Sequence, residues 1–246
     1  MIMVKRLVAK LICSSIVGNF LRRIFDDRIP INGLIIDTHA VTGQTCASLF
    51  WGLYESAEVR FIERYLHVNQ PVIELGSSLG VISCLIRRRV DPKYELICVE
   101  ANPQIVGSLK ANLQTNNLMH NVCIFQQAID YMQSEVMLNL GASNTTPMIA
   151  QDRQGDILVT TLTLSKLLSD KQIATDYTLV ADIEGAEAGI IYEDKIALEN
   201  CRQIIIELHS TYYEGQYINS ENMIDQLSSY GYRLCDRYGS VCVFEK

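Results

Sequence analysis

The sequence predicts an α/β protein built on a doubly wound, mostly parallel sheet. Between about residues 54 and 210, short apolar runs alternate with segments of helical periodicity, as parallel strands and their crossover helices do. A loop with two glycines, residues 76–80, follows the first of these runs. The last two apolar runs are separated only by the turn at Tyr238-Gly239, so they must pair antiparallel.

The predicted elements occur in a regular order along the chain. A helix over Glu55–Val68 comes first, and a later helix starts at Pro103 with Asn102 as its cap. The expected strands are 71–75, 96–99, 122–125, 177–181, 203–208, 232–236 and 240–244, and further helices are expected at 79–89, 184–192 and 220–230. A seven-stranded, mostly parallel sheet with a C-terminal antiparallel hairpin is typical of the Rossmann-like class I methyltransferases.

The segment between the third and fourth strands holds additional strand-like pieces. They cover residues 136–140 and 157–163 and are joined by the polar stretch 141–146. Segments inserted at this position often shape the pocket for the acceptor substrate, and a solvated pair of loops is the alternative.

The composition bounds the size and the partners of the protein. With 246 residues, 48% of them hydrophobic, the chain is long enough for one such domain with an appendage. We expect residues 1–50 to form an N-terminal helical extension and residues 51–246 to form the methyltransferase domain. The net charge of −7 argues against nucleic acid as a partner, because binding to phosphates requires a basic surface.

Neither the cysteines nor the histidines indicate a disulfide or a metal. The eight cysteines include no C-x-x-C pair and several lie in apolar runs, which favours reduced thiols and a cytoplasmic location. The four histidines show no H-x-x-x-H or H-E-x-x-H spacing, so no metal cofactor is expected. The sequence does not indicate an oligomeric state.

Residues 1–25 differ in composition from the rest of the chain. Apolar residues at positions 4, 8, 11, 12, 16 and 20 have helical spacing, and Lys5, Lys10, Arg22 and Arg23 lie beside them. The uncharged stretch Leu11–Leu21 is far shorter than the roughly 20 residues needed to cross a bilayer. We interpret the segment as a helix packed on the body of the protein. The alternative is a peripheral contact with an anionic membrane surface, because periodicity alone does not distinguish the two.

The loop after the first strand, ELGSSLG, has the form of a nucleoside-binding loop. Gly76 and Gly80 let the backbone turn sharply and approach a ligand where a side chain would clash. A dinucleotide fingerprint would also require glycines where Ser78 and Val81 stand. An acid, Glu74, two residues before a G-x-x-x-G pattern instead indicates S-adenosylmethionine, which carries no pyrophosphate.

Glu100 supplies the second half of this predicted site. It ends the second strand, 20 residues after Gly80, where a carboxylate can accept hydrogen bonds from both ribose hydroxyls of a nucleoside. A plain tight turn with a solvated glutamate is the alternative. The complete set of predicted cofactor contacts is Glu55, Glu74, Gly76, Ser78, Gly80, Glu100, Ala101, Ala128 and Asp182.

Four segments resemble the FkbM-type S-adenosylmethionine-dependent methyltransferases, and the resemblance covers about residues 50–210. The segments are Val72–Gly80, Val99–Pro103, Val180–Glu187 and Ile204–His209. The most specific part is the D-x-E-G-x-E block that starts at Asp182. The resemblance implies S-adenosylmethionine as the cofactor and methylation of hydroxyl groups on sugars or on polyketide natural products.

Methyl transfer to a hydroxyl requires a group that takes up the hydroxyl proton. Asp182 ends the fourth strand, and Glu207 and His209 end the fifth, so these side chains are expected side by side over the cofactor. Asp182 and His209 are the candidate bases, and Glu207 is a further catalytic candidate. We expect Glu184, Glu207 and His209 to bind the substrate, although Glu184 and Glu187 would also suit the dipole of the following helix.

The sequence thus predicts an S-adenosylmethionine-dependent O-methyltransferase that acts on a hydroxyl of a sugar or glycoconjugate. A polyketide or other small natural product is the alternative acceptor, and a non-catalytic S-adenosylmethionine-binding protein is the alternative class. Amino-group methylation is disfavoured, because it usually accompanies Asn/Asp-Pro-Pro-Tyr where this chain has Asp182-Ile183-Glu184-Gly185.

Overall fold

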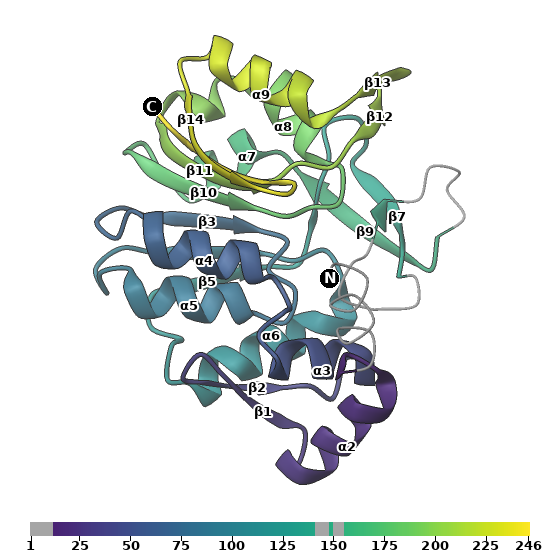
Figure 1. The fold of residues 1–246 in the computed structure, drawn as a ribbon. Coiled ribbons are helices and arrows are strands. Elements are labelled where there is room, and N and C mark those ends of the chain that lie inside the picture. The colour runs from purple at the N-terminus through teal and green to yellow at the C-terminus, as the bar shows by residue number, and fades with distance from the viewer. Residues whose placement is uncertain (1–11, 141–147, 150–154) are drawn as a thin grey trace, which may run out of the picture.

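A computed structural model describes residues 12–140, 148–149 and 155–246, and its centre is one seven-stranded sheet (Figure 1). The strands are β3 (Val72–Leu75), β4 (Leu96–Val99), β5 (Val122–Phe125), β10 (Tyr177–Ala181), β11 (Cys201–Glu207), β14 (Arg233–Tyr238) and β15 (Val241–Glu245). Their order is β14-β15-β11-β10-β3-β4-β5. The five from β5 to β11 run parallel, whereas β15 pairs antiparallel with β11 and β14. The predicted fold class, a Rossmann-like class I methyltransferase, is confirmed.

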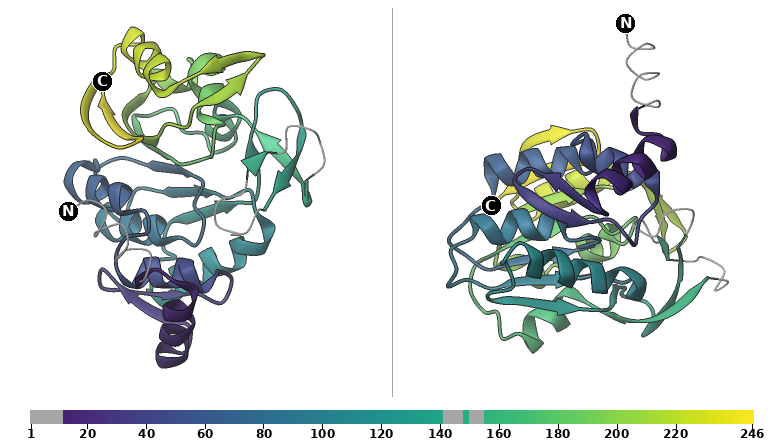
Figure 2. Two further views of the ribbon diagram at one scale, coloured as in Figure 1. Left: turned by 45° about the vertical axis from the view of Figure 1, so that its right-hand side comes forward. Right: turned by 90° about the horizontal axis from the view of Figure 1, so that it is seen from below.

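Helices cover both faces of this sheet (Figures 1 and 2). One face carries α4 (Ser56–Tyr65), α5 (Val81–Arg89) and α6 (Pro103–Thr115), and the other carries α7 (Leu164–Asp170), α8 (Glu187–Glu193), η1 (Ala197–Glu199) and α9 (Ser220–Ser229). Val180 of β10 packs into the first core, whereas its neighbours Leu179 and Ala181 pack into the second. Central strands are therefore buried on both sides, which is why the sequence shows them as continuous apolar runs.

Two helix ends differ from the predicted ends by three residues, whereas the other predicted helix ends and the strand ends agree to within two. α4 ends at Tyr65 because the backbone of Leu66 turns out of the helical region, with ψ of 124°. α8 begins at Glu187 rather than at Glu184, because Glu184 and Gly185 have φ of 52° and 107°, which no right-handed helix contains. The residues before α8 form a loop instead, and this loop carries part of the candidate site.

A smaller sheet follows β5 and lies beside the carboxyl ends of the central strands. It contains β6 (Ala128–Ile129), β7 (Glu135–Asn139), β8 (Met148–Ile149) and β9 (Ile157–Leu162). β7 pairs antiparallel with β9, which confirms the strand-like pieces predicted at 136–140 and 157–163. The polar stretch 141–146 lies outside the described residues. A hairpin of β12 (Thr211–Tyr213) and β13 (Gln216–Ile218) follows β11.

The N-terminal region combines two helices with a β hairpin. Its elements are α2 (Ser15–Phe25), β1 (Arg28–Ile31), β2 (Leu34–Asp37) and α3 (Gly43–Phe50), so the extension predicted over residues 1–50 is not helical throughout. Asn32 and Gly33 form the turn of the hairpin with φ of 48° and 74°. Asn-Gly between apolar runs is a strong local signal for such a turn. The expectation of a helical extension, which was based on helical periodicity, did not include it. Residues 1–11 of the predicted helix lie outside the described residues.

The hairpin is joined to the body through α6. The Asn112 side-chain oxygen accepts a hydrogen bond from the Asp37 N–H at 2.7 Å. Asn116 accepts from the Ile35 N–H at 2.9 Å and donates to the Ile35 carbonyl at 2.8 Å. Ile36 is fully buried in the same core as α5 and α6. The N-terminal region therefore shares the main core instead of forming a separate unit.

α2 packs on α3 by close contact between two glycines. A Cβ built on Gly18 would lie 1.5 Å from the Gly43 carbonyl oxygen, so the backbones touch at this crossing. Leu21 is buried beside this contact. Thus the described part of the N-terminal helix packs on the body. Among the helices within 12–140 and 155–246, none is long and apolar enough to cross a membrane.

Replacing Gly18 with alanine is expected to destabilise the protein. The added methyl has no space at the α2–α3 crossing, and overpacking of this kind costs about 1–3 kcal/mol in free energy of unfolding. Chemical denaturation would measure the loss. Gly107→Ala in α6 is the matched control, because nothing lies within 4 Å of its Cβ position, and it should be neutral or stabilising. Equal stability of Gly18→Ala and wild type would contradict the packing described here.

Candidate active site

A cavity opens at the carboxyl ends of β3, β4 and β10. Counting its open mouth, it encloses about 760 Å³ of space. From β3 the chain adds β4 and β5 on one side, and from β10 it adds β11 on the other side. The boundary between β3 and β10 is therefore a topological switch point, where ligands bind in such sheets. The lining residues are Tyr54, Glu55, Gly76, Ser78, Val99, Glu100, Ala101, Gln127, Ala128, Ile129, Leu138, Ile149, Asp182, Ile183, Glu184 and Ala186.

The glycine loop between β3 and α5 forms one wall of this cavity. Gly76 has φ of 84°, and a Cβ there would lie 1.8 Å from the Asp182 backbone oxygen. Glycine is therefore required at 76 so that the loop can close against the end of β10. Gly80, in contrast, does not line the cavity: its Cβ would meet the Leu109 side chain at 2.5 Å. Gly80 thus allows close packing of the loop on α6, and its cofactor contact stays a prediction.

Glu74 holds the loop from inside, and it lines a smaller adjoining cavity rather than the larger one. Its side chain is buried and accepts hydrogen bonds from the Ser83 hydroxyl at 2.5 Å and the Ser77 hydroxyl at 3.1 Å. Burial raises the pKa of Glu74 to about 7. Because Glu74 lies within β3, its carboxylate faces α5 and does not reach the strand end. Glu74 does not line the larger cavity, and its cofactor contact stays a prediction.

Glu100 lies directly after β4 and lines the cavity. Only 3% of its surface is exposed, and its two oxygens accept the backbone N–H groups of Ser78 and Asn102, each at 2.7 Å. Burial raises the pKa of Glu100 above its ordinary value. Each carboxylate oxygen can accept a second hydrogen bond, so Glu100 presents two fixed acceptors to a ligand.

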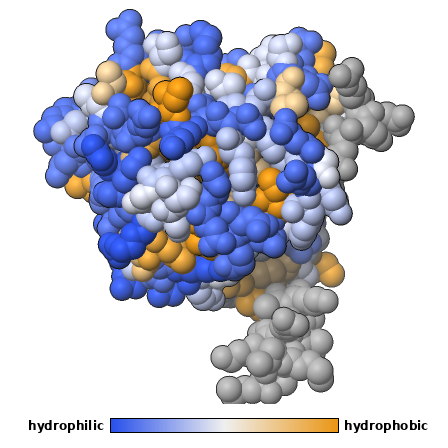
Figure 3. Space-filling model, turned by 90° about the horizontal axis from the view of Figure 1, so that it is seen from above, coloured by the Kyte–Doolittle hydropathy of each residue, from blue (hydrophilic) through white to orange (hydrophobic). Residues whose placement is uncertain are grey.

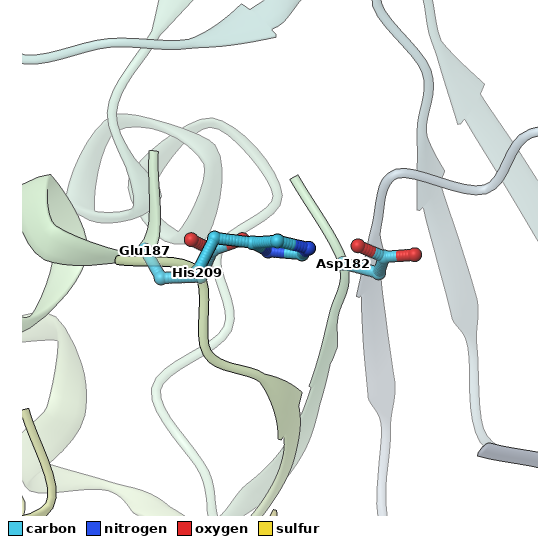
Figure 4. A group of neighbouring side chains, drawn as sticks. All are labelled: Asp182, Glu187 and His209. Carbon is cyan, nitrogen blue, oxygen red and sulfur yellow. The ribbon is translucent and has the colours of Figure 1, made fainter. Parts of the chain in front are cut away.

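The acids at the ends of β10 and β11 gather around His209. Its Nδ1 lies 3.2 Å from Glu187 Oε1, and its Nε2 lies 3.5 Å from Glu184 Oε2 and 3.7 Å from Glu207 Oε1. The imidazole ring lies between the carboxylates of Glu187 and Asp182 (Figure 4). The structure therefore brings together all of the predicted catalytic and substrate-binding residues.

Glu187 holds this arrangement in place through hydrogen bonds to the loop before α8 and to His209. Its side chain is fully buried and accepts the backbone N–H groups of Ile183 and Gly185, each at 3.0 Å. The same carboxylate faces His209 Nδ1, which must donate because a carboxylate is an acceptor only. Glu187 thus orders the loop that carries Asp182 and points Nε2 of His209 toward the other acids.

The closely spaced carboxylates and His209 shift one another's pKa values, most clearly those of Asp182 and His209. Burial and then the charge of Glu207 raise the pKa of Asp182 to about 8, although His209 lowers it. Burial lowers the pKa of His209, but the hydrogen bond and charge of Glu187, with Asp182 and Glu184, raise it to about 9 overall. The charges of the cluster thus raise the pKa values of both groups.

Asp182 keeps an acceptor available. Its Oδ1 is buried and, within the part of the chain that the structure describes, has no hydrogen-bond partner. An unpaired buried oxygen is costly unless a ligand supplies a donor. Asp182 as a residue lines the cavity, so its carboxylate lies at the wall that a ligand would meet.

A second, smaller cavity of about 330 Å³ adjoins the first. Both are lined by Glu55, Gly76 and Asp182, and Glu207 lines the smaller one together with Glu58. Sequence reasoning missed Glu58, although it follows Glu55 by one helical turn and so faces the same side of α4. Burial raises the pKa of Glu58 to about 7.

Sequence reasoning also missed part of the larger cavity. Tyr54, whose hydroxyl lies 3.1 Å from the Ser78 hydroxyl, directly precedes the predicted Glu55, and Gln127 precedes the predicted Ala128. Leu138 and Ile149 come from the small sheet, so part of the 131–163 segment does line this pocket. No local sequence signal marks Leu138 or Ile149 as lining residues.

Two groups of side chains have the composition of a divalent-cation site. One is Asp182, Glu187 and His209, and the other is Glu58, Asp182 and Glu207; in each, potential ligand atoms lie within 4.8 Å of one another. In the first group Glu187 Oε1 already faces both the Ile183 N–H and His209, which leaves it no further lone pair. The expectation that no metal is needed stays a prediction.

The fold and this site define a class I methyltransferase, and the sequence identifies its family. The family described as "Methyltransferase FkbM domain" matches residues 74–234, more than half of the chain. The chain therefore belongs to the FkbM methyltransferase family. A search of curated protein sequences finds no match.

Solved structures with a similar fold share little sequence with this chain. A protein of the NADB-Rossmann superfamily from Streptococcus agalactiae is 11% identical, with a TM-score of 0.47, over 76% of this chain and 67% of the other. Precorrin-6y C5,15-methyltransferase from Geobacter metallireducens is 11% identical, with a TM-score of 0.44, over 89% and 97%. Aeropyrum pernix fibrillarin, solved with natively bound S-adenosyl-L-methionine, is 12% identical, with a TM-score of 0.45, over 78% and 74%.

The stability of the ligand-free protein is expected to fall as pH rises. Asp182 and His209 both have raised pKa values, so the folded protein binds more protons than the unfolded chain. The Asp182 contribution is lost between its ordinary pKa of about 4 and pH 8, and the His209 contribution between about 6.5 and 9. Asp182→Asn should flatten this dependence and raise the melting temperature at pH 8.5 by at least about 2–4 °C, the equivalent of 1 kcal/mol.

Thermal denaturation from pH 5 to pH 9 measures both effects. Asp225→Asn, an exposed aspartate on α9, is the matched control and should follow wild type. If Asp182→Asn also follows wild type across this range, the pKa of Asp182 is not raised in the folded protein.

Proposed function

We propose that this protein is an S-adenosylmethionine-dependent O-methyltransferase that acts on a hydroxyl of a sugar or glycoconjugate. One observation carries the proposal. A cavity with an acidic wall, at the carboxyl ends of β3, β4 and β10, meets at Asp182 a cluster of acids around His209. The first part suits a cationic nucleoside, and the second suits the removal of a proton from a hydroxyl.

The charge of the cavity wall supports S-adenosylmethionine over a dinucleotide. The described lining includes Glu55, Glu100, Asp182 and Glu184 and no lysine or arginine. S-adenosylmethionine carries a sulfonium and an ammonium group, which these carboxylates attract, whereas the pyrophosphate of a dinucleotide would be repelled. Burial and the charge of Asp182 hold the pKa of Glu55 well above its ordinary value, and a nearby cation would relieve that cost.

The residues present fit each part of that cofactor. Glu100 offers two fixed oxygens for the ribose hydroxyls. The apolar side chains of Val99, Ile129 and Leu138 offer a surface for the adenine ring. Glu55, at the start of α4, is the carboxylate that we assign to the ammonium group. When bound, the cofactor supplies an electrophilic methyl group.

Asp182 is assigned as the group that takes the hydroxyl proton. Its raised pKa makes it a stronger base than an ordinary carboxylate, and its Oδ1 has no competing partner in the described part of the chain. His209, the other predicted base, lowers the pKa of Asp182 and so acts as the partner that favours its ionised form. Glu187 positions His209 for this role.

The acids around the acceptor side favour a polyhydroxylated substrate over an apolar one. Glu184 and Glu207 are partly exposed, with 22% and 25% of their side chains accessible, and both face His209. Exposed carboxylates accept hydrogen bonds from several hydroxyls at once, as a sugar ring presents them. This favours a glycan over a polyketide as the acceptor.

Glu100→Ala is expected to weaken binding of S-adenosylmethionine by about 10–150-fold. Losing a hydrogen bond to a charged acceptor costs about 1.5–3 kcal/mol, and each 1.4 kcal/mol is a factor of ten in Kd. Isothermal titration calorimetry gives the affinity. The exposed Glu199→Ala is the control, and thermal denaturation shows whether the loop held by Glu100 is intact. Unchanged affinity in a folded Glu100→Ala protein would contradict the ribose assignment.

Asp182→Asn is expected to lose about 10²–10⁴-fold in turnover, because a base is removed from the transition state only. The assay follows labelled methyl from S-adenosylmethionine into a glycan pool, with mass spectrometry of the sugar products. Affinity for the cofactor should change by less than about threefold, because Asp182 is assigned to the acceptor hydroxyl. His209→Gln should shift the pH–rate profile to higher pH, since the imidazolium lowers the pKa of Asp182.

The outcomes separate the alternatives. Cofactor binding without any labelled product from sugars or from polyketide acceptors would identify a binding protein. Loss of cofactor affinity in Asp182→Asn would make Asp182 a cofactor ligand, and Glu207 would be the next base to test. Activity that chelation abolishes and Mg²⁺ or Mn²⁺ restores would show that one of the acidic groups holds a metal.

A further inference from the structure

Helix α2 has two apolar faces, and only one of them is covered. The face with Gly18 and Leu21 packs against α3. On another side, Ile16, Phe20 and Ile24 are 83%, 63% and 58% exposed. They are spaced by four residues, so they form one continuous stripe along the helix.

The stripe lies at one end of the molecule, away from the central sheet (Figure 2). Elsewhere the surface is different: the face over α9 and the β12–β13 hairpin is mostly hydrophilic, with apolar residues only in small scattered groups (Figure 3). Three large apolar side chains exposed in a row on one helix are therefore a distinctive feature that needs a partner.

The charge around the stripe identifies the kind of partner. Residues 1–25 contain five basic residues, Lys5, Arg6, Lys10, Arg22 and Arg23, and no acid, whereas residues 26–246 carry a net charge of −12. Arg23 is exposed beside Ile24 and Phe20 on α2. A second copy of this helix would bring like charges together, while an anionic lipid surface would neutralise them.

We propose that α2 docks on an anionic membrane surface, with Ile16, Phe20 and Ile24 in the interfacial layer and the exposed Arg23 on lipid headgroups. An amphipathic helix of this composition lies in the plane of the interface. The packed face keeps α2 attached to the body, so docking requires no unfolding. This inference depends on the surface of α2 and not on the proposed reaction.

The docking surface is also close to the cavity along the chain. The Trp51 indole donates a hydrogen bond to the Ile12 carbonyl at 3.1 Å, so the end of α3 lies beside the beginning of α2. Trp51 and Leu53 are both substantially exposed, and the next residue, Tyr54, lines the cavity. Binding at α2 would thus bring this connecting segment toward the lipid.

Co-sedimentation with vesicles tests the proposal. Wild-type protein should bind vesicles of phosphatidylcholine with about one-third phosphatidylglycerol at least tenfold better than pure phosphatidylcholine, and added salt should weaken binding. Combined Ile16→Ser, Phe20→Ser and Ile24→Ser should reduce binding by about tenfold or more. Arg23→Glu should reduce it by a smaller factor, about fivefold.

The matched control replaces three exposed apolar residues elsewhere, Met132, Leu158 and Ile196, with serine, and it should bind as wild type does. Melting temperatures equal to wild type show that each variant is folded. The proposal is overturned if wild type does not bind the anionic vesicles, or if the α2 triple variant binds them equally well. It is also overturned if light scattering shows a dimer that the triple variant dissociates, because a second copy would then cover the stripe.

Discussion

The site depends on the burial of several like charges around one cation. Glu184, Glu187 and Glu207 all lie within 4 Å of the His209 ring, and Asp182 is near enough to raise its pKa. Such a group is unfavourable in a partly buried environment unless protons or cations compensate it. The protein meets this demand in part with the His209 charge and in part with the two backbone N–H groups bound by Glu187. The negative charge that remains uncompensated favours binding of a cationic ligand.

Placing this cluster beside the cofactor cavity requires a tight junction between two strands. The loop after β3 closes directly onto the end of β10, where Gly76 leaves no space for a side chain against the Asp182 backbone. Glu74 secures the loop from inside through Ser77 and Ser83. Asp182 and Glu184 of the D-x-E-G-x-E block thus face the cavity opposite a loop that an interior acid and a glycine hold in place.

The fold and half of the site could be predicted because their signals are local. Buried parallel strands appear as apolar runs, and Asn102-Pro103 marks the start of α6 in the sequence itself. Gly76 and Glu100 follow directly after strands β3 and β4, so their place at the carboxyl edge follows from chain order. Glu74 lies one residue before the end of β3, and only the structure shows that its carboxylate binds the Ser77 and Ser83 hydroxyls.

The sequence by itself determined the class of sheet, the glycine loop, and the acids and histidine that the site would contain. Only the tertiary structure decided their protonation and their partners. The contact of His209 with Glu187 and the grouping of Glu58 with Glu207 join residues from different elements, and no periodicity records such distances. The apolar residues of α2 are a second example, because their helical spacing does not indicate which of them are buried. Only the close approach of Gly18 to Gly43 determines which of its faces is buried and which is left to a partner.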